Sequence, residues 1–442
     1  MTGSSPKQDH RGEQTAPSLR ARARRLGGYA FWTSAGFFLP VAVDRLVICP
    51  LLNKHLGPEV FGAFIWVIGI MNLFGSVVAN GLAILLMRDL VRQPKESAGQ
   101  WVRTAMLLSG GLSSVVLIIV SLISHAAADD AVQRHALATY IPLGIYALVR
   151  SFELIVITDL RMRRRFVGVF VLRVIECVAL LGNLLIVPTQ NLWGIGMVYA
   201  VSVLLPLPVG MRWTREVFGS RQWWDSRAAK ALLMGCFGGA GITFFEQARV
   251  YASRTVLGSL SGSAEVAILY AGTSVGNMFV MPVGVLASLV LSLLAGKKTF
   301  ALPGRRGLTY ALLTAGLAVA VGTASFVCGR WLVAILYPQL APQTLPFYHW
   351  IALANGCTTV IAMMRPVAIK YAPMKLVVYL SGFTLVVQLG ALAVMVPLAQ
   401  ARGAALSLAG SSLLAALLWL VFFHWVCRAA GRESSPAAKA VD

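Results

Sequence analysis

Apolar runs recur along almost the whole chain and are separated by short polar connections that are rich in arginine. Each run has about 20 residues or more, the length that a helix needs to cross the hydrocarbon of a bilayer. The runs lack the alternation of barrel strands, and a helix satisfies its own backbone groups in lipid. We therefore expect an all-α polytopic membrane protein with about twelve spans, at residues 29–52, 60–86, 104–124, 137–159, 167–188, 191–211, 230–256, 266–295, 307–329, 345–364, 376–398 and 404–427.

The connections between these spans are of two kinds, which alternate along the chain. Lys and Arg are retained on the cytoplasmic side of short loops, so the alternation predicts the orientation of every span and places both termini in the cytoplasm. The basic set is the N-terminal arm and segments 88–103, 161–165, 212–230, 297–306, 365–375 and 428–439. The other set holds only Lys54, Arg134, Arg330 and Arg402.

The composition agrees with a protein that lies almost wholly in the membrane. Of its 442 residues, 57% are hydrophobic and 12% are charged, and the mean hydropathy is +0.74. The net charge of +21 would suggest a nucleic-acid partner in a soluble protein, but the loop alternation accounts for it here, and we expect no nucleic-acid partner. The six cysteines fall in or beside apolar runs without paired short spacing, so we expect no disulfide, metal ligand or cofactor.

The longest cytoplasmic connection, residues 212–229, carries tryptophans beside its arginines and divides the spans into two sets of six. We expect a basic cytoplasmic arm at 1–28, an N-terminal six-helix lobe at 29–211, the linker at 212–229, a C-terminal six-helix lobe at 230–427 and a cytoplasmic tail at 428–442. A short repeat supports two lobes, since Arg45–Leu51 reads against Arg254–Leu260, although apolar segments resemble one another easily. Two lobes of the same orientation are expected to enclose a central cavity.

Charged side chains also occur inside the predicted spans, where each costs about 2.5–3.5 kcal/mol at the bilayer centre unless it faces protein or water. They are Asp44, Arg45, Arg150, Glu153, Arg173, Glu176, Glu246, Arg249 and Arg254. Three pairs of an acid and an arginine are three residues apart, which puts both members on one helix face. The charges can neutralise one another, or the arginines can line a cavity for an anionic headgroup, because guanidinium binds phosphate oxygens in a bidentate manner. Both interpretations stay open, and they can apply to different residues.

Two segments carry a family resemblance. The sequence LGPEVFG at Leu56–Gly62 and the sequence GLAILLMRDLVR at Gly81–Arg92 resemble the signature of Wzx-type polysaccharide flippases. These belong to the multidrug/oligosaccharidyl-lipid/polysaccharide exporter (MOP) superfamily. The resemblance is sharpest over residues 40–92 and extends loosely to the whole chain. It implies two six-helix lobes that alternate between inward-open and outward-open states in the bacterial inner membrane.

The resemblance also implies a substrate and a set of site residues. The substrate is an undecaprenyl-diphosphate-linked oligosaccharide repeat unit, moved from the cytoplasmic to the periplasmic leaflet for the synthesis of lipopolysaccharide or exopolysaccharide. Further implied partners are membrane lipids and the polymerase and chain-length proteins of the same pathway. The residues expected to bind the diphosphate and acidic sugars are Arg45, Arg150, Arg173, Arg249 and Arg254. The candidates for coupling to H⁺ or Na⁺ are Asp44, Glu153, Glu176 and Glu246.

One departure from the family pattern leaves the coupling ion open. Asp44 and Arg45 match an acidic and basic pair that often closes the first span in relatives, whereas Ser253 stands before Arg254 where an acid is frequent. The buried acids also admit a multidrug or cation antiporter of the same superfamily, although each acid has an arginine close by.

A membrane enzyme that polymerises or ligates glycans is a further alternative. Such an enzyme would need catalytic groups on an ordered outer loop, but the longest periplasmic connections, His125–Leu137 and Gly329–Leu345, carry no cluster of them. The sequence contains no nucleotide loop, metal-ligand spacing or nucleophile motif elsewhere. We therefore expect a transporter and not an enzyme.

Overall fold

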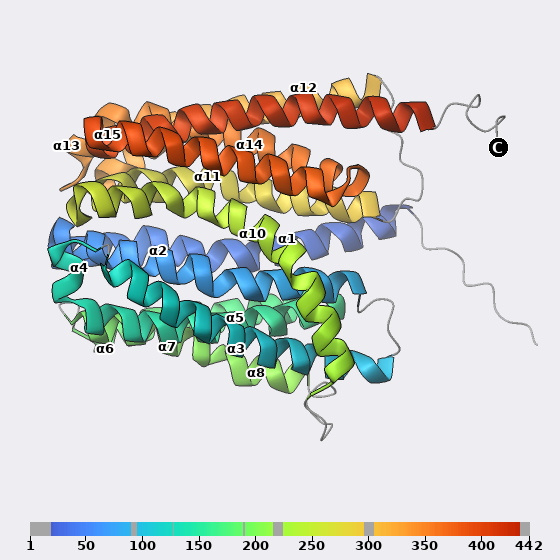
Figure 1. Ribbon diagram of the computed structural model, residues 1–442, viewed down its shortest axis with the longest axis horizontal. Coiled ribbons are helices and arrows are strands. Elements are labelled where there is room, and N and C mark those ends of the chain that lie inside the picture. The colour runs from blue at the N-terminus through green and yellow to red at the C-terminus, as the bar shows by residue number, and fades with distance from the viewer. Residues whose placement is uncertain are drawn as a thin grey trace, which may run out of the picture.

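A computed structural model describes residues 19–89, 95–126, 128–188, 191–214, 224–295 and 305–433. Within these ranges every regular element is a helix and no strand occurs. The long helices lie side by side along one direction and form an elongated bundle (Figure 1). The expectation of an all-helical membrane protein is confirmed.

The chain folds into two lobes, which lie one above the other in Figure 1. The first lobe consists of α1 (Leu19–Val43), the π-helical turn η1 (Asp44–Ile48), α2 (Cys49–Asp89), α3 (Lys95–Ala126), α4 (Asp130–Arg134), α5 (Ala136–Met162), α6 (Phe166–Ile186), α7 (Leu192–Leu204) and α8 (Pro206–Trp213). The second lobe consists of α10 (Ser226–Ser261), α11 (Ser263–Ala295), α12 (Arg305–Leu336), α13 (Ala341–Thr344), the 3₁₀ turn η3 (Leu345–Phe347), α14 (Tyr348–Tyr371) and α15 (Met374–Glu433).

Nine stretches of the described residues are long and apolar enough to cross a membrane. Two of them, Ser34–Met87 and Lys375–Arg428, have 54 residues each, which is about 80 Å of helix and more than twice the thickness of the hydrocarbon. Each is broken near its middle, at Gly57 (φ 77°, ψ 165°) and at Gln400 (φ 49°, ψ −129°). Each therefore supplies two of the predicted spans, and the predicted span at 230–256 lies within α10.

The two ends of the bundle differ in charge. The first residue of α1 and the last residue of α15 lie at the same end (Figure 1), which we call the basic end because it also holds the arginine-rich turn Arg161–Arg165 between α5 and α6. The opposite end carries α4, α13 and the two breaks (Figure 1). Because the two ends of the described chain lie at the same end of the bundle, the chain crosses the bundle an even number of times. The alternation of basic connections predicts the same.

The two lobes are in close contact at the opposite end. Ser263, at the start of α11, donates from both its backbone N–H and its hydroxyl to Oδ2 of Asp129, each over 2.7 Å. A Cβ atom on Gly62 of α2 would lie only 1.8 Å from the carbonyl oxygen of Ser263, so this approach of the two backbones requires glycine. The indole of Trp66 donates to the carbonyl of Thr255 over 3.1 Å. The lobes are therefore closed together at this end.

Helix α10 packs against both lobes. In its first turns, Leu232 and Cys236 are buried in a cluster with Leu85 of α2 and other side chains of the first lobe. Further along, the backbone carbonyl of Arg249 accepts a hydrogen bond from Gln388 of α15 over 2.9 Å. Packing alone sets no boundary near residue 230, and the predicted limits of the two lobes stay a prediction.

Candidate functional site

The first span departs from regular α-helical geometry at Asp44 and Arg45. The backbone N–H of Cys49 donates to the carbonyl of Asp44, five residues back, which makes a π-helical turn. The cause lies in the sequence, because Pro50 has no N–H for the carbonyl of Leu46, and its ring would press on that carbonyl in a regular helix. Such π turns occur frequently at functional sites.

Asp44 takes part in a chain of polar groups that passes from one lobe to the other. The hydroxyl of Tyr199, on α7, donates to Oδ1 of Asp44 over 2.5 Å. The thiol of Cys49 lies 3.7 Å from the same oxygen and 3.1 Å from the hydroxyl of Tyr270, on α11. The carboxylate is therefore connected to the second lobe through two neutral side chains.

Two arginines, one from each lobe, lie beside this series of hydrogen-bonded polar groups, and neutral groups hold them there. Arg45 donates to the carbonyl of Ser274 on α11 over 3.3 Å. The guanidinium of Arg254, on α10, lies 4.7 Å from the ring centroid of Tyr270, where the ring face attracts a cation, and it donates to the hydroxyl of Thr273 over 3.3 Å. Within the described residues, neither arginine forms an ion pair with a carboxylate.

The same groups surround a small cavity of about 60 Å³ between the lobes. Its lining residues are Asp44, Arg45, Cys49, Phe64, Ile65, Ile68, Gly69, Asn72, Tyr199, Tyr251, Arg254 and Tyr270. Two arginines and one aspartate give this lining a formal charge of +1. The volume is enough for a few water molecules but far below the roughly 300–1,000 Å³ of typical ligand pockets. A large substrate can enter only after the lobes separate.

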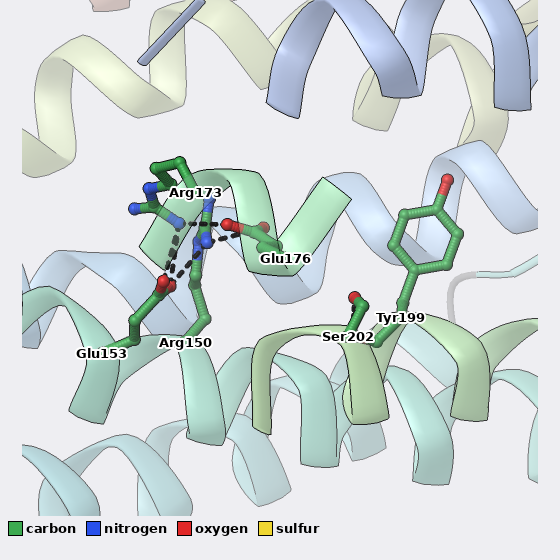
Figure 2. Close-up of polar contacts among 6 residues, drawn as sticks. All are labelled: Arg150, Glu153, Arg173, Glu176, Tyr199 and Ser202. Atoms are coloured by element: carbon green, nitrogen blue, oxygen red, sulfur yellow. Dashed lines mark hydrogen bonds and ion pairs between the residues drawn. The ribbon is translucent and has the colours of Figure 1, made fainter. Parts of the chain in front are cut away.

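Four further predicted site residues form a buried quartet within the first lobe (Figure 2). Arg150 on α5 lies 2.6 Å from Glu153 and 2.9 Å from Glu176 on α6. Arg173 on α6 lies 2.9 Å from Glu153 and 2.5 Å from Glu176. Each arginine therefore contacts both glutamates, and the quartet is neutral. In this conformation Arg150 and Arg173 connect α5 to α6.

The remaining two predicted residues belong to a cluster in the second lobe, between the cavity and the basic end. Glu246 of α10 forms an ion pair with Arg365 of α14. Arg249, one helical turn further along α10, donates to the hydroxyl of Ser412 over 3.4 Å. The buried Nε of Arg249 has no hydrogen-bond partner within the described part of the chain. Two arginines and one glutamate leave this cluster with a net positive charge.

The structure thus divides the nine predicted residues among three places. Asp44, Arg45 and Arg254 meet at the cavity, while the others lie in the quartet or in the second-lobe cluster. Sequence reasoning missed Tyr199 and Tyr270 because an uncharged tyrosine in an apolar run carries no signal of its own. It placed Arg365 in a cytoplasmic connection, whereas this residue lies inside α14, just before Pro366.

Comparisons with known proteins identify the fold. No family model matches the chain, and no curated protein matches it. Among solved structures, the chain is similar to a multidrug resistance MATE family transporter of the MOP superfamily. In its inward-facing conformation the TM-score is 0.68 at 14% identity, over 96% of this chain and 98% of that one. In its outward-facing conformation the TM-score is 0.68 at 14% identity, over 93% and 97%.

A third similar structure is a MOP superfamily transporter from Pyrococcus furiosus Vc1, for which the reverse polarity of the binding pocket suggests a different function. The TM-score is 0.65 at 14% identity, over 92% of this chain and 96% of that one. At this level of identity the similarity establishes the fold, which is the two-lobed fold of MATE transporters.

Proposed function

We propose that the protein is a flippase that moves an undecaprenyl-diphosphate-linked oligosaccharide from the cytoplasmic to the periplasmic leaflet, for the synthesis of cell-surface polysaccharide. The observation that carries this proposal is the pair Arg45 and Arg254, which reach one cavity from different lobes and share it with a single carboxylate, Asp44. Permanently charged guanidinium groups bind phosphate oxygens in a bidentate manner. A site of this charge favours an anionic group over a cationic drug.

The fold supports a transport cycle in which the lobes alternate. Structures of the same fold are described in both inward-facing and outward-facing conformations. In the Pyrococcus furiosus transporter, a reversed pocket polarity suggests a different function, so pocket charge is a reasonable guide to substrate class in this fold. The diphosphate and glycan would pass through the cavity between the lobes while the lipid tail stays in the bilayer.

The distribution of charge suggests the orientation. The basic end carries the arginine-rich turn at 161–165, and we assign it to the cytoplasm because arginine is retained there. Both termini would then be cytoplasmic, in the inner membrane of a bacterium. The polymerase and chain-length proteins of the same pathway would act on the glycan after it has crossed.

The other predicted residues receive different roles under this proposal. Arg249, in the positively charged cluster between the basic end and the cavity, would contact acidic sugars as the substrate enters. Arg150 and Arg173 would bind substrate only if the quartet opens. Asp44 could take up H⁺ or Na⁺ during the cycle, since a charge within the membrane requires a partner and the groups that contact its carboxylate here, Tyr199 and Cys49, are neutral. The three glutamates at 153, 176 and 246 are further candidates for this coupling.

A deletion strain of the source bacterium tests the proposal. We expect it to lose surface polysaccharide and to accumulate complete lipid-linked repeat units in the cytoplasmic leaflet. Complementation with Arg45→Gln or Arg254→Gln should lower the flipping rate about tenfold or more, because a hydrogen bond to a charged group contributes about 1.5–3 kcal/mol. Arg330→Gln, an exposed arginine at the opposite end, is the control. Unchanged flipping in glutamine variants of all five predicted arginines would reject the cavity model.

The same strain separates the flippase from the alternatives. The similarity to multidrug resistance transporters and the half-buried Asp44 at the cavity favour a multidrug or cation antiporter as the second candidate. That function predicts normal polysaccharide and reduced efflux of cationic dyes. A polymerase or ligase would instead leave complete repeat units in the periplasmic leaflet, so the leaflet in which they accumulate distinguishes the enzyme from the flippase.

A further inference from the structure

A second and larger cavity lies in the first lobe at the basic end. Its volume is about 570 Å³, and its lining comes from α1, the turn between α5 and α6, the first turns of α6, and α8. The lining residues are Gly28, Trp32, Arg164, Arg165, Phe166, Val167, Gly168, Val171 and Trp213. None of these residues lines the cavity between the lobes. We call this second cavity the α6 groove.

Among the described residues that line it, the only charged ones are Arg164 and Arg165. Three of the four arginines between residues 161 and 165 have a partner among the described residues. The guanidinium of Arg161 lies 4.2 Å from the ring centroid of Phe37, and Arg163 forms an ion pair with Asp159 over 2.9 Å. Arg165 donates to the carbonyl at Trp213, the last residue of α8, over 2.5 Å.

Arg164 is the member of this turn whose guanidinium has no partner among the described residues. Its backbone has a φ of 57°, a value that residues other than glycine rarely adopt. This conformation separates helix α5 from helix α6, and the exposed guanidinium of Arg164 lies at the groove. The groove is therefore an apolar slot with a positive charge at its mouth.

The groove continues into a face of α6 that is exposed along the length of the lobe. Val167, Val178, Leu181 and Leu185 are 53%, 65%, 36% and 89% exposed. Val178 follows Val167 by about three helical turns, and Leu181 and Leu185 follow by about one turn each, so all four lie on one helix face. Between Val167 and Val178, the half-buried Val171 and Val174 lie on the same face. In a helix of a membrane protein, an exposed apolar face of this kind faces the acyl chains of lipids.

Two tryptophans form the walls at the level of the arginines. The ring of Trp32 lies 4.9 Å from that of Phe170. The ring of Trp213 lies so close to Gly168 that a Cβ atom there would meet it at 3.3 Å. Tryptophan and arginine together are typical of the headgroup level of a bilayer. The groove thus has cations at the level of the lipid headgroups and continues into an apolar surface on which an acyl chain can lie.

We propose that the α6 groove binds one anionic phospholipid from the adjacent leaflet. Its phosphate would lie between Arg164 and Arg165, and one acyl chain would follow Trp32, Val171 and the exposed face of α6. Charge complementarity selects the anionic class, because the described lining contains two arginines and no carboxylate and so attracts a net negative headgroup. This inference does not depend on what the central cavity transports.

Native mass spectrometry of the full-length protein tests the proposal. The protein in detergent is titrated with phosphatidylglycerol and with phosphatidylcholine of the same acyl chains. We expect one phosphatidylglycerol to be retained in preference to phosphatidylcholine. Arg164→Asn removes the cation but tolerates the positive φ, and should weaken binding about 5-fold, while adding Arg165→Gln should bring the loss to about 30-fold. Val167→Trp, at an exposed position, should block the groove without disturbing the core.

The control is Arg227→Gln, an exposed arginine at the basic end of α10, which should leave lipid binding unchanged. Equal retention of phosphatidylglycerol by wild type and all groove variants would overturn the proposal. Equal binding of phosphatidylcholine would remove the role of the arginines, and displacement of the lipid by inorganic phosphate alone would remove the role of the acyl chain. Much tighter binding of a polyprenyl phosphate than of phosphatidylglycerol would show that the occupant was assigned wrongly.

Discussion

Replacing Arg173 by leucine would remove one positive charge from a buried group of two arginines and two glutamates. Among the described residues, Arg150 would then be the only cation paired with Glu153 and Glu176, at 2.6 Å and 2.9 Å respectively. One carboxylate would remain buried without compensation. Breaking a buried ion pair in this way costs about 3–5 kcal/mol, most of it the desolvation of the charge left behind.

A second substitution makes the reasoning testable. In the double variant Arg173→Leu with Glu176→Leu, the remaining pair of Arg150 and Glu153 is neutral. Replacing a buried pair by apolar side chains is often neutral or stabilising, so most of the lost stability should return. This recovery is the result that a simple count of lost contacts does not predict, because the double variant loses more polar contacts than the single one.

The measurement is the apparent melting temperature of the full-length protein in detergent. A loss of 3–5 kcal/mol corresponds to roughly 5–20 °C for a folding unit of about 200 residues. The control is Arg134→Gln, which breaks an ion pair with Glu59 whose side chains are 66% and 59% exposed, and which should cost less than about 1 kcal/mol. A double variant as unstable as the single one would refute the reasoning. A stable Arg173→Leu protein with lost flipping would instead support a substrate-binding role for Arg173.

Two further predictions concern the contact between the lobes at the opposite end, with labelling of a protein that retains Cys49 as its only cysteine as the measurement. Asp129→Asn weakens two charge-assisted hydrogen bonds from Ser263, and labelling by an impermeant maleimide from the side that carries α4 should rise about tenfold; an unchanged rate would mean that Asp129 does not hold the lobes together. Gly62→Val should raise the rate in the same way through the clash with Ser263, whereas Gly410→Val, where a Cβ atom meets nothing within 4 Å, should not.

The fold could be predicted from the sequence because the bilayer itself imposes it. The thickness of the hydrocarbon sets the length of each apolar run, and the retention of arginine on one side sets the alternation of the connections. The predicted gap between residues 52 and 60 contains Gly57, where α2 is broken. The gap between 398 and 404 likewise contains the break at Gln400.

The site was predictable only where the spacing along one helix decided it. The three-residue spacing brought Arg150 to Glu153 and Arg173 to Glu176, and both are ion pairs. The same spacing did not make an ion pair of Glu246 and Arg249, because Glu246 pairs with Arg365 from another helix. Which faces of two helices meet depends on the packing of the whole bundle, and periodicity within one segment does not specify it.

Helix α10 has a mechanical consequence for any motion of the two lobes. Its first turns are packed into the first lobe at Leu232, and its middle is bonded to the second lobe at Arg249. If the lobes part at the basic end, α10 must bend in the glycine-rich stretch 235–241 or release its first turns. Release is inexpensive in a membrane, since lipid tails solvate a freed leucine as well as a neighbouring helix does. While the first turns of α10 stay packed in the first lobe, the helix links the two lobes. The length of α10 between Leu232 and Arg249 then limits how far the lobes can separate at the basic end.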